Sequence, residues 1–132
     1  MKFKNSIFAF LIIASCFFLG HFLSVRFSGT DRTFPIQIKI DFGTVRKPVH
    51  KETLFIENGT TPKEAVSQIF PVLSGKACCS FRDVIEIGGV RINPQKNLWW
   101  ICLLNGSRNV SPYKNKLKPG DVLEWKYIHE SK

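Results

Sequence analysis

The 132-residue sequence predicts an α+β domain, with a mixed sheet of about five strands and one helix on one face, preceded by an N-terminal membrane helix. Three observations predict this fold. Residues 34–42 alternate strictly between apolar and polar side chains, as a half-buried strand does. Residues 61–64 carry a complete helix start. The elements follow the order strand, strand, helix and then three strands, and one helix covers only one face of such a sheet.

The first predicted element is the membrane helix, in residues 1–27. Residues 7–25 contain no Lys, Arg, Asp or Glu, and their helix would span roughly 28 Å, about the thickness of a hydrocarbon core. Lys2 and Lys4 precede this run, so we expect the N-terminus to stay inside. The sequence therefore predicts a single-pass membrane protein whose C-terminal domain is extracytoplasmic, in a periplasm or at a cell surface.

Two alternatives to a retained anchor stay open. Cys16 ends an Ile-Ala-Ser-Cys sequence, the order of a lipoprotein signal, which would give a lipid-anchored form. A cleaved secretory signal would give a secreted form. However, the run stays apolar past Cys16, and cleavage sites near Gly20, Ser24 or Gly29 would have a bulky or charged residue at the upstream small position. The sequence thus favours a retained anchor.

Residues 28–33 form a short polar linker, and residues 34–132 form the predicted domain. Its first strand is the alternating segment 34–42, which has one buried face. After a loop at residues 43–48, residues 51–57 give a second strand, the expected hairpin partner of the first.

The helix follows the turn at residues 58–59. Thr61 is the expected N-cap, Pro62 occupies the first helical position and Glu64 completes a capping box. This cap satisfies backbone N–H groups that the first turn leaves unpaired. We expect Pro71 and Gly75 to end the helix. The apolar residues expected to face the sheet are Val66, Ile69, Phe70 and Leu73.

Three more strands are predicted at residues 84–87, 98–104 and 122–128. Turns at residues 88–89 and 105–106, and a type II turn at residues 118–121, separate them. A hairpin followed by a crossover helix predicts a β-grasp arrangement. The first and last strands would then lie parallel at the centre of the sheet.

The last third of the chain contains sequence motifs that resemble those of a known protein family. Its motifs are an aromatic strand that starts at Trp99-Trp100 and ends in Asn105-Gly106, a Pro-Gly-Asp turn at residues 119–121, and a Trp-x-Tyr strand at residues 125–127. They resemble an uncharacterised bacterial β-grasp family of unknown function, related to the C-terminal domain of transcobalamin, over roughly residues 36–128. The resemblance implies a β-grasp fold, an extracytoplasmic setting and a small ligand or protein partner. Cobalamin is the cofactor-like ligand it implies; in transcobalamins a much larger helical domain also contacts that ligand, and we expect no counterpart here.

Three cysteines lie in the predicted domain: Cys78, Cys79 and Cys102. Adjacent cysteines bond to each other only with strain, so in an oxidising compartment we expect a disulfide between Cys102 and either Cys78 or Cys79. This bond would tie the loop after the helix to the aromatic strand. The functional alternatives are a thiol redox pair and a three-thiolate metal site, but the spacing fits neither, and no metal site is predicted.

The aromatic strand supplies the candidate binding surface. Because strand side chains alternate, Trp100, Cys102 and Leu104 point one way and Trp99, Ile101 and Leu103 the other. With a single helix, one set should face the uncovered side, where an apolar patch marks contact with a partner, unless loops bury it. The candidate ligand- or partner-binding residues are Trp99, Trp100, Asn105, Gly106 and Tyr113.

The net positive charge of the chain limits the classes of partner that it would attract. The chain carries a net +9, and from Arg26 onward 17 Lys and Arg stand against 10 Asp and Glu. This favours anionic lipid or envelope polymer. Basic residues interleaved with aromatics are also typical of proteins that bind single-stranded nucleic acid, but the predicted extracytoplasmic location argues against that partner. No Ser-His-Asp order, paired carboxylates or phosphate loop stands out, so we predict no catalytic residue and no enzyme.

The leading interpretation is a membrane-anchored extracytoplasmic binding module for a small molecule or a protein. One alternative is a thiol redox protein that uses Cys78, Cys79 and Cys102. Another is a structural accessory subunit of a membrane complex.

Overall fold

The computed structural model describes residues 32–75 and 83–130. The predicted membrane helix of residues 1–27 lies outside these ranges, as do Cys78 and Cys79. Within the two described ranges, no helix combines the length and the apolar character needed to cross a membrane.

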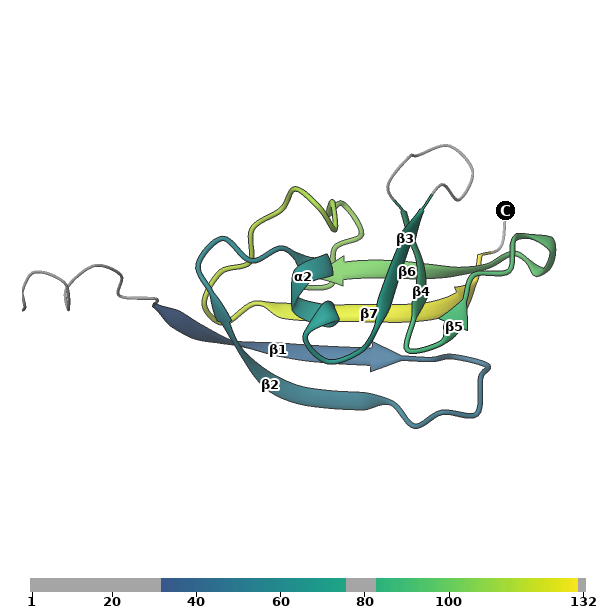
Figure 1. Ribbon diagram of the computed structural model, residues 1–132, viewed down its shortest axis with the longest axis horizontal. Helices are drawn as coiled ribbons and strands as arrows, with labels where there is room; N and C mark the ends of the chain where they lie inside the picture. Colours follow the sequence, from purple (N-terminus) through teal and green to yellow (C-terminus); the bar gives the residue numbers. More distant parts are fainter. Residues whose placement is uncertain (1–31, 76–82, 131–132) are drawn as a thin grey trace, which may run out of the picture. The chain divides into compact units, whose positions relative to one another are not determined.

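The described elements form an α+β fold of two sheets and one short α-helix (Figure 1). In chain order they are β1 (Thr33–Asp41), β2 (His50–Glu57), α2 (Pro62–Ser67), β3 (Val72–Gly75), β4 (Asp83–Ile87), β5 (Val90–Arg91), the 3-10 helix η1 (Pro94–Lys96), β6 (Leu98–Leu104) and β7 (Val122–His129).

The larger sheet has four strands in the order β2-β1-β7-β6. Strands β1 and β2 pair antiparallel as a hairpin, and β1 and β7 pair parallel at the centre, with Ile40 opposite Trp125. Strand β6 pairs antiparallel with β7 and forms one edge. The predicted hairpin and the predicted parallel central pair are both confirmed.

The expected single sheet of about five strands is wrong. Residues 84–87 belong to a second sheet, of order β3-β4-β5, and do not extend the first. Helix α2 is shorter than expected, and residues that the prediction placed in its last turn form strand β3 instead. Pro71 lacks the N–H group that would continue the helix, and the chain extends from Val72 to pair with β4. Leu73, expected on the buried helix face, is therefore an exposed strand residue.

Helix α2 starts as predicted. The Thr61 hydroxyl accepts a hydrogen bond from the Glu64 backbone N–H at 3.3 Å, and the Glu64 carboxylate accepts one from the Thr61 N–H at 2.8 Å. A helix of six residues is unstable alone, so packing must hold it. Pro62, Ala65 and Val66 supply that packing from its buried side.

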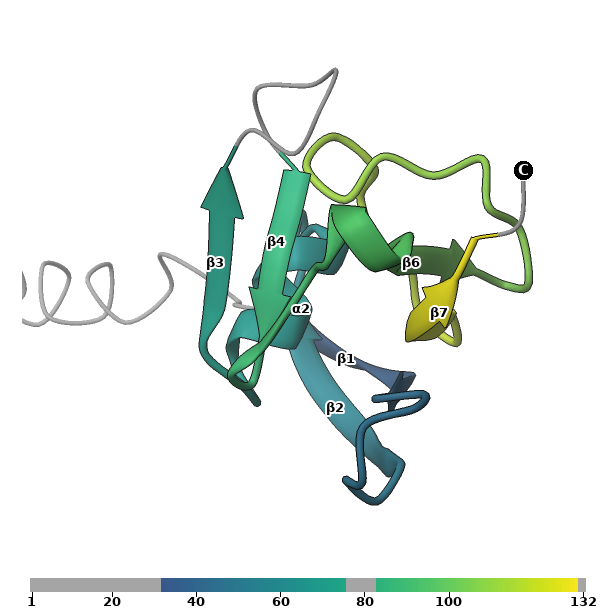
Figure 2. The same cartoon turned by 90° about the vertical axis from the view of Figure 1, so that its right-hand side faces the viewer.

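Helix α2 and the β3-β4-β5 sheet lie on the same side of the four-stranded sheet (Figure 2). We call this side the inner face, and the opposite side the outer face. The core fills the inner face and includes Ile36, Ile38, Ile40, Val66, Ile87, Trp100, Leu123 and Trp125. Within residues 32–75 and 83–130, no helix or strand packs on the outer face (Figure 2).

Gly43 explains the sharp exit from β1. Its φ of +58° is a left-handed conformation that other residues adopt only with strain. A Cβ at this position would also lie 1.9 Å from the Tyr127 carbonyl oxygen. Glycine is therefore required where the chain leaves β1 beside β7.

Candidate binding surface

Strand β6 separates two sets of side chains. Trp100 and Cys102 point to the inner face and are each only 8% exposed. Trp99, Ile101 and Leu103 point to the outer face and are half-buried. The alternation predicted from the sequence is confirmed, and the set that faces the uncovered side is the one that contains Trp99.

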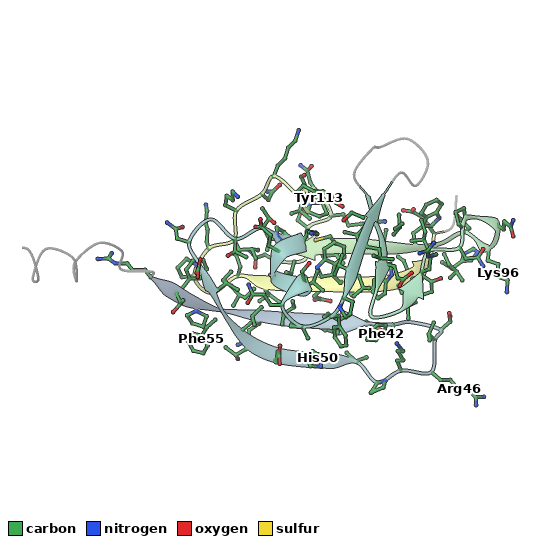
Figure 3. The ribbon with its side chains drawn as sticks, in the orientation of Figure 1. Phe42, Arg46, His50, Phe55, Lys96 and Tyr113 are labelled. Atoms are coloured by element: carbon green, nitrogen blue, oxygen red, sulfur yellow. The ribbon has the colours of Figure 1, made fainter. Side chains whose placement is uncertain are left out.

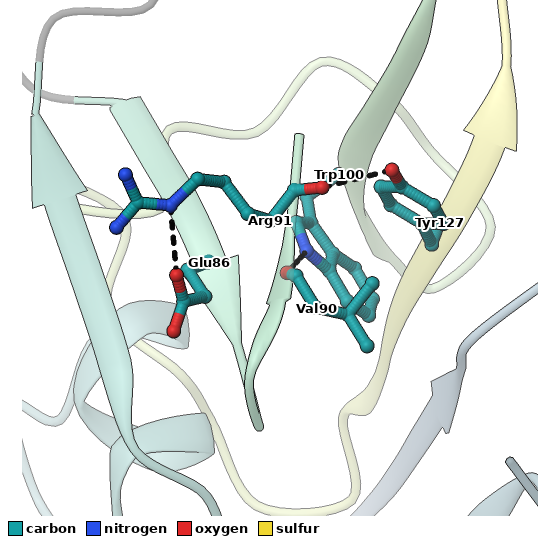
Figure 4. Close-up of polar contacts among 5 residues, drawn as sticks. All are labelled: Glu86, Val90, Arg91, Trp100 and Tyr127. Atoms are coloured by element: carbon teal, nitrogen blue, oxygen red, sulfur yellow. Dashed lines mark hydrogen bonds and ion pairs between the residues drawn. The ribbon is translucent and has the colours of Figure 1, made fainter. Parts of the chain in front are cut away.

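Trp100 belongs to the core rather than to a surface. Its indole N–H donates a hydrogen bond to the Val90 carbonyl at 2.8 Å, and the Tyr127 hydroxyl donates one to the Arg91 carbonyl at 2.8 Å (Figure 4). The Trp100 ring also packs edge-on against Phe42. Trp100 and Tyr127 thus fasten the short strand β5 to the four-stranded sheet. A binding surface on β6 would therefore include Trp99 but not Trp100.

Four half-buried apolar residues form a continuous strip on the outer face, which we call the apolar strip: Trp99, Ile101, Leu103 and Ile128. Trp99 lies directly opposite Ile128 of β7. The indole N–H of Trp99 donates to the Asn97 side-chain oxygen at 2.8 Å, and the Asn97 amide donates to the Glu130 carbonyl. Asn97 therefore holds the indole in a fixed orientation.

Charged residues border the apolar strip. Lys126 lies opposite Ile101, and Glu124 lies opposite Leu103. The Glu124 carboxylate is 3.0 Å from the Lys126 ammonium and 3.5 Å from the Lys39 ammonium. The hydrogen bond and charge of Lys126, helped by Lys39, lower the pKa of Glu124 despite partial burial. The strip thus has an ionised border on the β7 side.

Asn105 and Gly106 shape the end of β6. Both have positive φ, +51° and +80°, and Leu104 and Ser107 exchange two backbone hydrogen bonds of 3.0 Å across them. This is the geometry of a type I′ turn. The Asn105 side chain also donates to Asp121 at 2.9 Å and accepts from the Val122 N–H at 2.8 Å. Its polar atoms are used to join β6 to β7.

Tyr113 lies apart from Trp99. Its ring packs against the core, and the neighbouring Pro112 carbonyl accepts a hydrogen bond from the Lys63 N–H in the first turn of α2. Figure 3 shows Tyr113 beside this covered side of the sheet. Its hydroxyl is buried and makes no hydrogen bond to another described residue. The structure therefore does not bring Tyr113 onto the apolar strip.

Cys102 is a buried, free thiol within the described residues. Burial raises its pKa to about 12, so the thiol is neutral near pH 7. The partners expected for a disulfide, Cys78 and Cys79, lie outside the described residues, so that pairing stays a prediction. The described ranges also contain no cluster of three His, Cys, Asp or Glu that could hold a metal ion.

Sequence reasoning missed two residues of this surface. Ile128 follows Glu124 and Lys126 on the outer face of β7, and an apolar residue after two charged ones on that face was the available signal. Asn97 adopts a left-handed conformation with a φ of +53° at the end of η1. Its contact with Trp99 depends on that conformation, which the sequence did not indicate.

Comparisons with known proteins support the fold. A scan against protein-family models and a search of curated proteins found no match. Among solved structures, haptocorrin in complex with Cbi matches with a TM-score of 0.60 at 11% identity, over 76% of this chain and 26% of that chain. A proposed metal binding protein from Ruminococcus gnavus ATCC 29149 matches with a TM-score of 0.53 at 14% identity, over 74% of this chain and 99% of that chain.

The chain thus spans about a quarter of the haptocorrin chain and nearly all of the Ruminococcus gnavus protein. At such low identity these likenesses establish a shared fold. The transcobalamin-like resemblance noted in the sequence is supported at the level of the fold.

Proposed function

We propose that this protein is a membrane-anchored extracytoplasmic binding module whose contact surface is the apolar strip. The observation that carries the proposal is the position of Trp99. Trp99 is half-buried on a sheet face on which no described helix or strand packs, beside three other apolar side chains. We also infer a binding role rather than a catalytic one.

The apolar strip departs from the neighbouring part of the outer face. The part of that face formed by β1 and the middle of β7 is polar, with Gln37, Lys39, Asp41, Glu124 and Lys126. An uncovered sheet face is ordinarily polar, and a contiguous apolar patch on it marks a contact site. The departure is concentrated on the edge strand β6, which argues for a local binding surface.

The Trp99 indole is also suited to binding. Tryptophan is among the side chains that contribute most to binding energy at interfaces. Because Asn97 already fixes the indole, little side-chain entropy would be lost when a partner packs on it. The ionised border formed by Glu124 and Lys126 would favour a ligand with an apolar face and a polar rim.

A corrinoid is the first ligand to test. Haptocorrin, which shares the fold, has been crystallised with Cbi. Since this chain spans only about a quarter of haptocorrin, we propose that it contacts one side of such a ligand and that a protein partner contacts the other.

The test is a titration of the full-length protein in detergent with cyanocobalamin, followed by calorimetry and the visible spectrum. We expect saturable binding with a Kd below about 10 μM, or roughly 7 kcal/mol, and about tenfold weaker binding by Trp99→Ala. Phe55→Ala is the matched control, since Phe55 is 64% exposed on β2 at the opposite edge of the sheet. Equal affinities for the wild type and Trp99→Ala would contradict the assignment. Failure of all three proteins to bind would exclude a corrinoid and direct the search to protein partners by co-purification.

The burial of Cys102 argues against a redox role for one of the three cysteines of the thiol redox alternative. A redox cysteine needs an accessible thiolate, whereas Cys102 is buried with a raised pKa. Titration of the native full-length protein with a thiol reagent tests this directly. Fast modification of Cys102 would restore its redox role, and slow modification of all three cysteines, Cys78, Cys79 and Cys102, would remove the redox hypothesis.

A further inference from the structure

A second surface lies at the end of the domain where β1 begins. Phe55, the most exposed of the large apolar side chains in the described chain, lies on the outer face of β2 directly opposite Pro35 of β1. The Gly120 N–H donates to the Pro35 carbonyl at 3.1 Å, and Val122, 40% exposed, follows two residues later. We call Pro35, Phe55 and Val122 the apolar tip. Figure 3 shows Phe55 towards this end and Lys96 towards the other.

Three exposed lysines accompany the apolar tip. Lys114, Lys116 and Lys118 alternate along the segment of residues 114–118, which we call the lysine loop. The loop is held in place by Leu117, which is 2% exposed and donates its N–H to the Thr60 carbonyl at 2.9 Å. Among the described residues none of the three lysines forms an ion pair, unlike Lys39 on the outer face.

Two of the acidic residues at the same end, Glu64 and Asp121, accept hydrogen bonds that stabilise the fold. Glu64 accepts the Thr61 N–H of the capping box, and that hydrogen bond is the main cause of its lowered pKa. Asp121 accepts hydrogen bonds from the Lys118 N–H and the Asn105 side chain. Glu57 is exposed. The charge of Lys116 also contributes to the lowered pKa of Glu64, but none of the three lysines is held in an ion pair with another described residue, so the lysine loop keeps most of its charge available to an anionic partner.

The short length of chain between the predicted membrane segment and β1 points to that partner. Strand β1 begins at Thr33, and the predicted membrane segment ends at residue 25. The residues between them can extend over roughly 25 Å at most. A domain anchored in this way must keep the β1 end close to the bilayer, where an unpaired cation gains about 1 kcal/mol near anionic lipid, equivalent to about fivefold in binding.

We propose that the apolar tip and the lysine loop dock the domain on the anionic lipid surface of its own membrane, with Phe55 entering the interfacial layer. This inference rests on the anchored binding module proposed above. It also gives that module an orientation. Strand β7 runs away from this end, and Trp99 lies opposite Ile128 near its far end. Docking by the apolar tip leaves the apolar strip open to its ligand.

The test places p-benzoylphenylalanine at position 55 of the full-length protein, incorporated in phosphatidylcholine vesicles with or without about 30% phosphatidylglycerol. We expect photo-crosslinking to lipid at position 55 and severalfold more of it in the anionic vesicles. The matched control carries the same residue at position 96, which is exposed at the opposite end and should crosslink weakly in both. In a background of Lys114→Glu, Lys116→Glu and Lys118→Glu, crosslinking from position 55 should fall at least fivefold. These sites are exposed, so the core is unaffected.

Equal crosslinking from positions 55 and 96, or equal crosslinking with and without the three Glu substitutions, would overturn the proposal. Flotation of the vesicles separates this failure from failure of the anchor. If the protein floats with the vesicles but does not crosslink to lipid at position 55, the anchor is supported and the docking proposal is wrong. A chain that floats with neither vesicle contradicts both the anchor and the docking. Cyanocobalamin titration of the same samples reports independently on the apolar strip.

Discussion

The two faces of strand β6 differ in what covers them rather than in composition. On the inner face, Trp100 contacts Phe42 and donates to the Val90 carbonyl beneath the β3-β4-β5 sheet. On the outer face, Trp99 donates only to Asn97, and no described element packs over it. Both faces carry one tryptophan and aliphatic neighbours.

Apolar character alone therefore does not separate a core from a contact surface. Trp100 is apolar and buried by the chain itself, so it stabilises the fold. Trp99 is equally apolar but only half-buried, and we propose that a partner buries its remaining surface. The predictions below test this separation, beginning with the largest effect.

Truncation of the two tryptophans should have unequal costs. Trp100→Ala removes a buried ring and its hydrogen bond to Val90, and should lower the free energy of unfolding by about 3–5 kcal/mol. Trp99→Ala removes a half-buried ring from a face on which no described helix or strand packs, and should cost about 1 kcal/mol or less. Urea denaturation of the two variants and the wild type measures both values. Equal losses would show that Trp99 also belongs to the core.

The turn after β1 tests the packing beside the inner face. Gly43→Ala combines a left-handed backbone with a Cβ 1.9 Å from the Tyr127 carbonyl oxygen, so we expect a loss of about 3 kcal/mol. Gly59→Ala is the matched control, because Gly59 also has a positive φ, +89°, but no atom within 4 Å of the added Cβ. It should cost only about 1 kcal/mol. A control that loses as much as Gly43→Ala would mean that backbone conformation, and not the contact with β7, decides the cost.

The smallest effect concerns acid stability. Hydrogen bonds from Thr61 lower the pKa of Glu64 in the folded state below its ordinary value of 4.5. A group with a lowered folded pKa stabilises the protein above its unfolded pKa, and this contribution is lost as the pH falls through the folded pKa. Glu64→Gln should therefore lose less stability than the wild type on acidification below about pH 5. Thermal unfolding across this range measures the difference, and parallel curves for the two proteins would contradict it. Glu124, whose pKa is also lowered, keeps some acid sensitivity in both.

The sequence predicted those parts of the fold that local pattern determines. Strict alternation in residues 34–42 gave β1, and the Thr61 and Glu64 pair gave the start of α2. The β3-β4-β5 sheet was not predicted because its strands are too short to show a clear alternation of apolar and polar residues. Alternation likewise placed Trp99 and Trp100 on opposite faces. Which face was covered depended on that second sheet, and so Trp100 was expected among the binding residues although it lies in the core.

The most direct test of the apolar strip uses fluorine NMR of the full-length protein labelled with 5-fluorotryptophan. The chain has three tryptophans, of which Trp100 and Trp125 are 8% and 1% exposed. Trp99→Phe identifies the Trp99 resonance by its absence. On titration with cyanocobalamin, we expect the Trp99 resonance to shift while the other two stay fixed. A shift of the Trp100 or Trp125 resonance with no change at Trp99 would contradict the assignment of the binding surface.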